Sequence, residues 1–79
     1  MQRVFILINA EHGKLWNIED KATEVSGVKM ACAVTGAFDV IVYAEVEDMS
    51  AVGALINVIH SIDGVNRTQT ALAIPKRVD

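Results

Sequence analysis

Gly27-Val28 and Gly64-Val65 decide the fold of this chain, because each pair ends a helix-like stretch and opens a strand-like stretch. The two pairs stand 37 residues apart, from 27 to 64 and from 28 to 65. An apolar run typical of a strand lies upstream of each pair, at residues 4–8 and 40–43. The chain therefore reads strand–helix–strand twice.

Two such units interleaved in one sheet predict a ferredoxin-like βαββαβ arrangement, an α+β fold with a four-stranded antiparallel sheet and two helices on one face. We expect a tight hairpin loop at about residues 35–37, and strands over about 3–9, 28–34, 38–46 and 65–74. We expect helices over about residues 14–25 and 49–62, the second capped by Asp48. Gly27 suits the left-handed position that follows the first helix.

The length of the chain predicts one domain, residues 1–79, near the lower size limit for a hydrophobic core that is stable alone. The chain is 52% apolar, and its one cysteine, Cys32, allows no internal disulfide. No cluster of histidine, cysteine and acidic residues indicates a structural metal, and no cofactor is expected. Association with further subunits is the remaining way to stabilise so small and apolar a chain, so we expect a homo-oligomer.

The charge pattern argues against nucleic acid and membranes as partners. The net charge is −3, and the basic residues are scattered rather than gathered into a phosphate-binding patch. No apolar stretch approaches the roughly 18 residues of a membrane span. The N-terminus runs directly into a strand without a cleavage-site pattern. We therefore expect a soluble cytoplasmic protein that makes no direct contact with DNA.

The strands predict how the subunits associate. If one sheet face met water, apolar and polar residues would alternate along each strand. Instead, residues 4–8 and 40–44 are unbroken apolar runs, and residues 30–34 are nearly so. Both faces of the sheet are therefore expected to be buried, one under the helices and one against the sheet of a second copy. We predict at least a dimer, formed by sheet-to-sheet packing.

The histidines, the cysteine and the tryptophan of the chain form no pattern that indicates a catalytic site. His12 and His60 have no second ligand at metal spacing. Cys32 lies in an apolar run, where cysteine behaves as a small hydrophobe. Trp16 falls outside the apolar stripe of the first helix, which favours contact with a loop or a neighbouring subunit. We therefore do not expect an enzyme.

Two short groups of residues are better candidates for a binding site. The first is the hairpin group Thr35, Gly36, Ala37, Phe38 and Asp39. Gly36 allows a positive φ there, and the Asp39 carboxylate borders an apolar strand and needs a polar partner. The second is Thr68 with Thr70, two apart on one face of the last strand, where both hydroxyls can bond a small polar ligand. The alternative is that Asp39 is a turn residue and the threonines are strand formers.

Four segments together carry a resemblance to a known family: Gly36-Ala37-Phe38-Asp39-Val40, Asp48 with its helix, Ile62-Asp63-Gly64-Val65 and Thr68-Gln69-Thr70. With them the chain resembles the ligand-sensing domain of the Lrp/AsnC transcription regulators, also called the RAM domain. The likeness spans essentially the whole chain and matches the βαββαβ order. Full-length members carry an N-terminal helix-turn-helix domain that residues 1–79 do not supply, so the chain resembles the stand-alone form.

The resemblance implies an oligomeric regulatory module that binds a free amino acid. Such domains pair through their sheets into dimers, which associate into tetramers or octameric rings and bind the amino acid between dimers. A full-length Lrp/AsnC-type regulator is implied as a partner, through which transcription is modulated indirectly. Carried over to this chain, residues 35–39 with Thr68 and Thr70 would line the site. Asp39 would pair with the ammonium group or a polar side chain, and the backbone of residues 35–38 would meet the carboxylate.

Two other functions stay open on the sequence. A small dimeric ferredoxin-like enzyme of the monooxygenase type would use a pocket between sheet and helices, with His60, Trp16 and Asp39 as its candidate residues. A purely structural assembly partner would form the same oligomer without a ligand. A cavity between sheet and helices would favour the enzyme, and a small polar pocket between dimers would favour the sensor.

Overall fold

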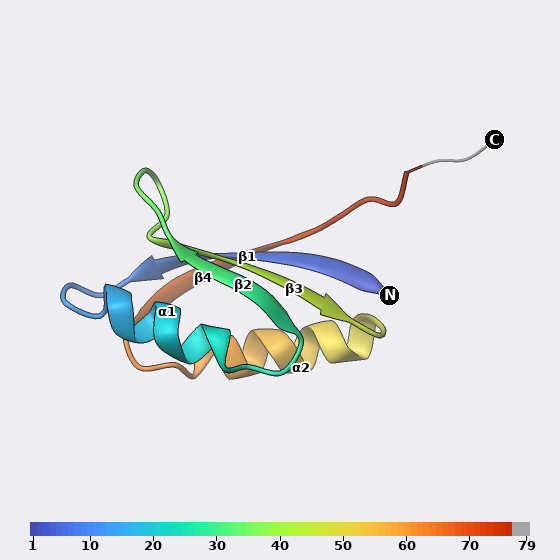
Figure 1. The fold of residues 1–79 in the computed structure, drawn as a ribbon, viewed down its shortest axis with the longest axis horizontal. Helices are drawn as coiled ribbons and strands as arrows, with labels where there is room; N and C mark the ends of the chain where they lie inside the picture. The colour runs from blue at the N-terminus through green and yellow to red at the C-terminus, as the bar shows by residue number, and fades with distance from the viewer. Residues whose placement is uncertain (77–79) are drawn as a thin grey trace.

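The computed structural model describes residues 1–76. Its elements follow the predicted order: β1 (Gln2–Ala10), α1 (Leu15–Thr23), β2 (Val28–Ala33), β3 (Val40–Val46), α2 (Met49–His60) and β4 (Val65–Leu72). The strands form one antiparallel sheet in the order β2-β3-β1-β4. Both helices lie on the same face of this sheet, so the ferredoxin-like fold predicted from the sequence is confirmed (Figure 1).

The two helices repeat the same buried stripe at the spacing of the glycine–valine pairs. Ile18 and Ala22 of α1 are buried, and so are Leu55 and Ile59 of α2, which follow 37 residues later, from 18 to 55 and from 22 to 59. In each helix the two residues lie about one turn apart, so each helix turns one apolar face to the sheet. α1 lies mainly over β2, and α2 lies mainly over β4.

The core lies between the helices and alternate residues of the two central strands. These residues, fully buried, are Val4, Ile6 and Ile8 of β1 and Val40, Val42 and Ala44 of β3. Burying each of the larger aliphatic side chains stabilises the fold by about 1.5–3 kcal/mol. Because side chains alternate across a strand, the residues between them point away from the helices.

A turn with a glycine at positive φ follows each helix. Gly27 has φ 92° and Gly64 has φ 100°. The helix α1 ends at Thr23, earlier than predicted, because the next two N–H groups bond to carbonyls three residues back instead of four. Gly27 therefore lies in the turn that leads into β2 rather than directly at the helix end. Asp48 caps α2 as predicted, since its carboxylate accepts from the Ala51 N–H at 3.0 Å.

The loop between β2 and β3 is longer than predicted. β2 ends at Ala33 and β3 begins at Val40, so the expectations of a tight loop at residues 35–37 and of a strand from Phe38 were wrong. Gly36 has φ 114°, a backbone conformation that favours glycine, as expected. The loop stands away from the helices, above the opposite face of the sheet (Figure 1).

Asp39 accounts for the longer loop, because it binds the end of β1. Its N–H donates to the Ile8 carbonyl, and its carboxylate accepts from the Ala10 N–H, each at 2.8 Å. The Val34 N–H donates to the Asp39 carbonyl, also at 2.8 Å, and closes the base of the loop. Asp39 thus anchors the loop to β1.

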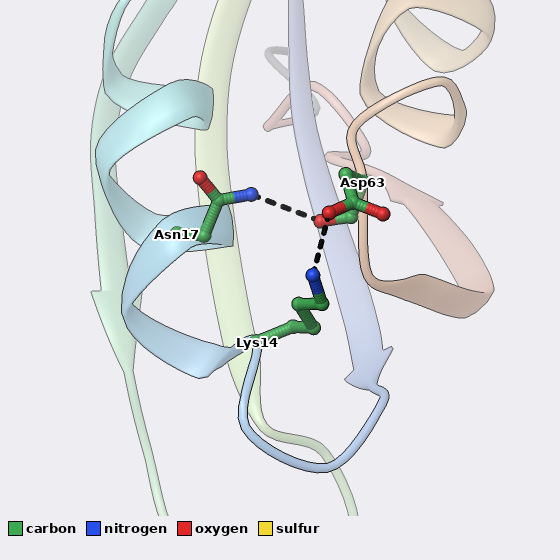
Figure 2. A network of polar contacts seen from close by, with 3 residues as sticks. All are labelled: Lys14, Asn17 and Asp63. Carbon is green, nitrogen blue, oxygen red and sulfur yellow. Dashed lines mark hydrogen bonds and ion pairs between the residues drawn. The ribbon is translucent and has the colours of Figure 1, made fainter.

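A polar network joins the start of α1 to the turn before β4 (Figure 2). The Lys14 ammonium lies 2.8 Å from an Asp63 carboxylate oxygen, and this hydrogen bond raises the pKa of Lys14. The Asn17 side-chain amide donates to the Asp63 carbonyl at 3.0 Å, and the Glu11 N–H donates to the Gly64 carbonyl at 2.7 Å. The two halves of the chain are therefore joined here by backbone and side-chain bonds together.

The Gly64 turn gives a test of this junction. Gly64→Ala should lower the free energy of unfolding by about 1–3 kcal/mol, because the backbone is at positive φ and a Cβ would overlap the Lys14 side chain. Gly53→Ala is the control: Gly53 lies within α2 with open space around it, so the change should add about 0.5–1 kcal/mol. Urea unfolding followed by circular dichroism measures both, and a neutral Gly64→Ala would contradict the role of the turn.

Asp39 gives a test of the loop anchor. Asp39→Ala leaves the part-buried Ala10 N–H without its acceptor, so the free energy of unfolding should fall by about 1–3 kcal/mol. Asp20→Ala removes an exposed carboxylate from α1 and should change it by no more than about 0.5 kcal/mol. The same urea measurement compares the two, and equal stabilities would show that Asp39 does not anchor the loop.

Candidate functional site

The sheet face that the helices leave uncovered is apolar over its central part, and polar residues such as Arg3, Glu45 and Gln69 lie around that part. We call it the open face and define it by Phe5, Leu7, Met30, Cys32, Ile41, Tyr43 and Ala71, which share a side by strand register. At its centre the ring centroids of Phe5 and Tyr43 lie 5.0 Å apart. Phe5 is 39% exposed and Met30 53% exposed. Such a contiguous apolar surface is typical of an interaction site.

A small hollow, which we call the hairpin pocket, lies where the β2–β3 loop meets β4. It has a volume of about 220 Å³ and is lined by Asn9, Ala37, Phe38, Arg67, Thr68 and Gln69. Asn9 stands opposite Arg67 in the strand register, and Leu7 of the open face stands opposite Gln69. The pocket therefore adjoins the open face at the end of β1.

Two local features shape the hairpin pocket. The Asn9 side-chain amide donates to the Ala37 carbonyl at 2.9 Å and so ties the loop to β1. The pairing of β1 with β4 shifts register between Asn9 and Ala10, which leaves Asn66 as an extra residue before Arg67. Bulges of this kind re-aim side chains and are common beside functional sites.

The structure brings some of the predicted site residues together. Ala37 and Phe38 of the loop line the hairpin pocket with Thr68 of β4. Thr35 and Gly36 lie further out, in the exposed part of the loop.

Asp39 and Thr70 lie outside the lining of the hairpin pocket. Asp39 is held by the Ala10 N–H, and Thr70 pairs with Ile6, which is buried on the helix-covered side of the sheet. Thr68 pairs with Ile8, which is also buried, so by register both threonines share the side of the helices rather than the open face, and Thr68 alone of the two lines the pocket.

Sequence reasoning missed Asn9, Arg67 and Gln69, which line the hairpin pocket. Asn9 is marked in the sequence as the polar residue that ends the apolar run of β1, whereas Arg67 and Gln69 lie in a largely polar strand that marks neither of them. Their grouping depends on the pairing of β1 with β4, which joins residues about 58–62 positions apart. Periodicity within a strand does not supply that pairing.

A second, larger hollow lies on the helical side of the sheet. This helix groove has a volume of about 720 Å³ and is lined mainly by apolar residues from the end of α1, the end of β3 and α2, among them Val25, Val46, Leu55, Val58 and Ile62. Its charged lining residues are Lys21, Glu24, Glu45 and Glu47. His60, Trp16 and Asp39 line neither hollow.

Two further findings concern the described residues 1–76. They contain no group of three or more histidine, cysteine and acidic side chains that could hold a metal ion. None of their helices is long and apolar enough to cross a membrane.

Solved structures share this fold over the whole chain. TTHA0845 from Thermus thermophilus superposes with a TM-score of 0.91 at 25% identity, with 100% of both chains covered. The hypothetical protein PHS023 from Pyrococcus horikoshii gives 0.87 at 28% identity, covering 96% of this chain and 93% of its own. The transcriptional regulator NMB0573 from Neisseria meningitidis, solved with L-Met, gives 0.84 at 20% identity, covering 99% of this chain and 53% of its own. A comparison with curated proteins gave no match.

The family comparison agrees with the architecture. The model of the Lrp/AsnC ligand binding domain matches residues 3–79, nearly the full length of the chain. That domain is a regulatory ligand-sensing module, as the resemblance in the hairpin and in the Thr68-Gln69-Thr70 segment implied. The chain belongs to the Lrp/AsnC ligand-binding domain family.

Proposed function

We propose that this chain is an oligomeric module that senses a free amino acid and modulates transcription indirectly, through full-length regulators of the Lrp/AsnC family. The observation that carries the proposal is an apolar open face that ends at a small polar pocket. The open face provides a surface for assembly, and the hairpin pocket beside it provides a binding site for a polar metabolite.

The open face supports a dimer formed by sheet-to-sheet packing. Phe5, Leu7, Ile41 and Tyr43 form two adjacent cross-strand pairs on the central strands. These side chains are already partly buried, so covering them in a dimer adds only part of the roughly 1.5–3 kcal/mol that full burial of a large apolar side chain contributes. A second copy offers the same surface related by a two-fold axis, as in most homodimers. Dimers would then associate further, into tetramers or octamers.

The hairpin pocket supports a ligand at the contact between dimers. Its walls come from a loop that stands above the sheet and from β4 at the sheet edge. In the proposed assembly, both lie at the edge of the dimer, where a neighbouring dimer would contact them. An amino acid is the proposed ligand because the family senses ligands and because the regulator NMB0573, which shares the fold, was solved with L-Met. Of the other predicted residues, Thr35, Gly36 and Asp39 would contribute by shaping the loop, whereas Thr70 lies on the helical side of the sheet, outside this pocket.

Regulation would follow from linkage between ligand and assembly. A ligand that binds one assembly more tightly than another shifts the population by its difference in affinity. A full-length regulator carries the same kind of domain, so mixed oligomers would pass the signal to DNA. The net charge of −3 is in keeping with this indirect route, because DNA binding requires a basic surface.

The helix groove is the observation that favours the alternative, a small enzyme with a pocket on the helical side. Its volume is sufficient for a small molecule. The enzyme reading relied on His60, Trp16 and Asp39, and none of them lines the groove. The groove is lined by Glu24, Glu45 and Glu47 and by Ser26 and Ser61, but among the described residues no hydrogen bond joins one of these serines to a carboxylate, and the Ser61 hydroxyl donates to the Val58 carbonyl. The sensor is therefore the better supported function.

A thermal-shift screen with the twenty amino acids tests the proposal. A ligand at about 100 times its dissociation constant adds about 2.7 kcal/mol to the native state. For a domain of this size that corresponds to a rise in Tm on the order of 10 °C. Phe38→Ala, which opens the hairpin pocket, should reduce the rise, and Ala54→Ser in the helix groove should not. If no amino acid raises the Tm of the wild-type chain, the sensing proposal fails.

A further inference from the structure

We propose that the hairpin pocket holds its ligand by a carboxylate group, and that the Arg67 guanidinium is the group that binds it. This inference rests on the proposed function, and it adds the group by which the ligand is held and the anchoring residue. It differs from the arrangement that the family resemblance implied, in which loop backbone groups met the carboxylate.

The charge of the pocket is the first argument. Arg67 is the one charged residue among those that line the pocket. Within residues 1–76 the only ion pair joins Lys14 to Asp63, so no carboxylate of that segment neutralises Arg67. A guanidinium presents a planar fork of donors that fits both oxygens of a carboxylate. The pocket therefore favours an anionic group over a cationic one.

The position of Asp39 is the second argument. Asp39 directly follows the pocket residues Ala37 and Phe38 in the sequence, yet its carboxylate does not line the pocket. It accepts from the Ala10 N–H at 2.8 Å, which directs it to the end of β1. Asp39 is thus engaged in holding the loop. The ammonium group of a ligand must find neutral acceptors instead.

The strand register is the third argument, because it sets Arg67 beside such an acceptor. The bulge at Asn66 brings Arg67 opposite Asn9, and cross-strand partners share one face of the sheet. The Asn9 amide nitrogen donates to the Ala37 carbonyl, which leaves the side-chain oxygen to accept. The Gln69 side chain, two residues along β4, offers a second neutral acceptor. Arg67 can thus bind a carboxylate, and the side-chain oxygens of Asn9 and Gln69 can accept from an adjacent ammonium group.

The size of the pocket is the fourth argument. Its volume of about 220 Å³ lies below the roughly 300–1,000 Å³ of sites for drug-sized molecules. Phe38 and Ala37 add apolar surface on the loop side. The ligand class is therefore a compact α-amino acid, bound through its carboxylate at Arg67 and through its ammonium at the amide oxygens.

The test separates the carboxylate from the rest of the ligand. The assembled wild-type protein is titrated in ¹H–¹⁵N NMR with L-alanine, L-leucine and L-methionine, and with the corresponding amino-acid amides. The oxo acid 4-methyl-2-oxopentanoate, which keeps the carboxylate of leucine and lacks the ammonium group, completes the set. We expect the acids to shift the backbone signals of Asn9, Ala37 and Thr68, and the amides to bind at least about tenfold more weakly.

Variants assign the preference to Arg67. Arg67→Ala should abolish the preference of acids over amides, and Arg67→Lys should retain part of it, because lysine keeps the charge without the planar fork. Lys21→Ala removes one positive charge at the helix groove and should leave the preference unchanged. A merely structural role of Arg67 would alter stability without altering the ratio of acid to amide affinity.

Each outcome decides between the two proposals. Equal binding of acids and amides would overturn the carboxylate assignment and leave amino-acid sensing standing. Binding of the oxo acid without any of the three amino acids would support the assignment and count against sensing. An unchanged preference in Arg67→Ala would overturn the role of Arg67. Shifts confined to the helix groove around Leu55, or no binding by any acid, would overturn the inference altogether.

Discussion

The structure depends on one imbalance: the central strands β1 and β3 are apolar on both faces of the sheet, and the helices cover only one of these faces. The central strands send Val4, Ile6 and Ile8 toward the helices and Phe5 and Leu7 away from them. Both sets are apolar because β1 is an unbroken apolar run. Residues 1–76 contain no further helix or strand that covers the second face. Covering it with another subunit is the physical basis of the proposed oligomer.

Much of the fold could be predicted because its determinants are local. The stripes of Ile18 with Ala22 and of Leu55 with Ile59 define the helices, and Gly27 and Gly64 mark the turns that follow. The hairpin was predicted less well. The conformation of Asp39 is set by its hydrogen bond to β1 rather than by the sequence pattern of β3. The loop is therefore longer than its sequence predicts. Tertiary bonds of this kind override local turn preference.

The candidate site could be predicted in part, for the same reason. The loop residues Ala37 and Phe38 and the strand residue Thr68 were found from short motifs. Asn9 and Arg67 were not, since their grouping needs the register between the first and last strands and a bulge at Asn66. In the sequence Arg67 is one of several scattered basic residues. Only the fold shows that it stands beside a polar pocket rather than in open solvent.

In the proposed function, the hairpin pocket at the edge of the open face couples ligand binding to assembly, so the interface is the central claim. Sedimentation equilibrium at micromolar concentration tests it most directly, on the wild-type chain, on Phe5→Asp and on Met49→Asp. Phe5 is 39% exposed on the open face, and Met49 is 56% exposed at the start of α2. The account predicts an even multiple of the subunit mass for the wild type and Met49→Asp, and a loss of assembly for Phe5→Asp. A folded, monomeric wild-type chain would contradict it.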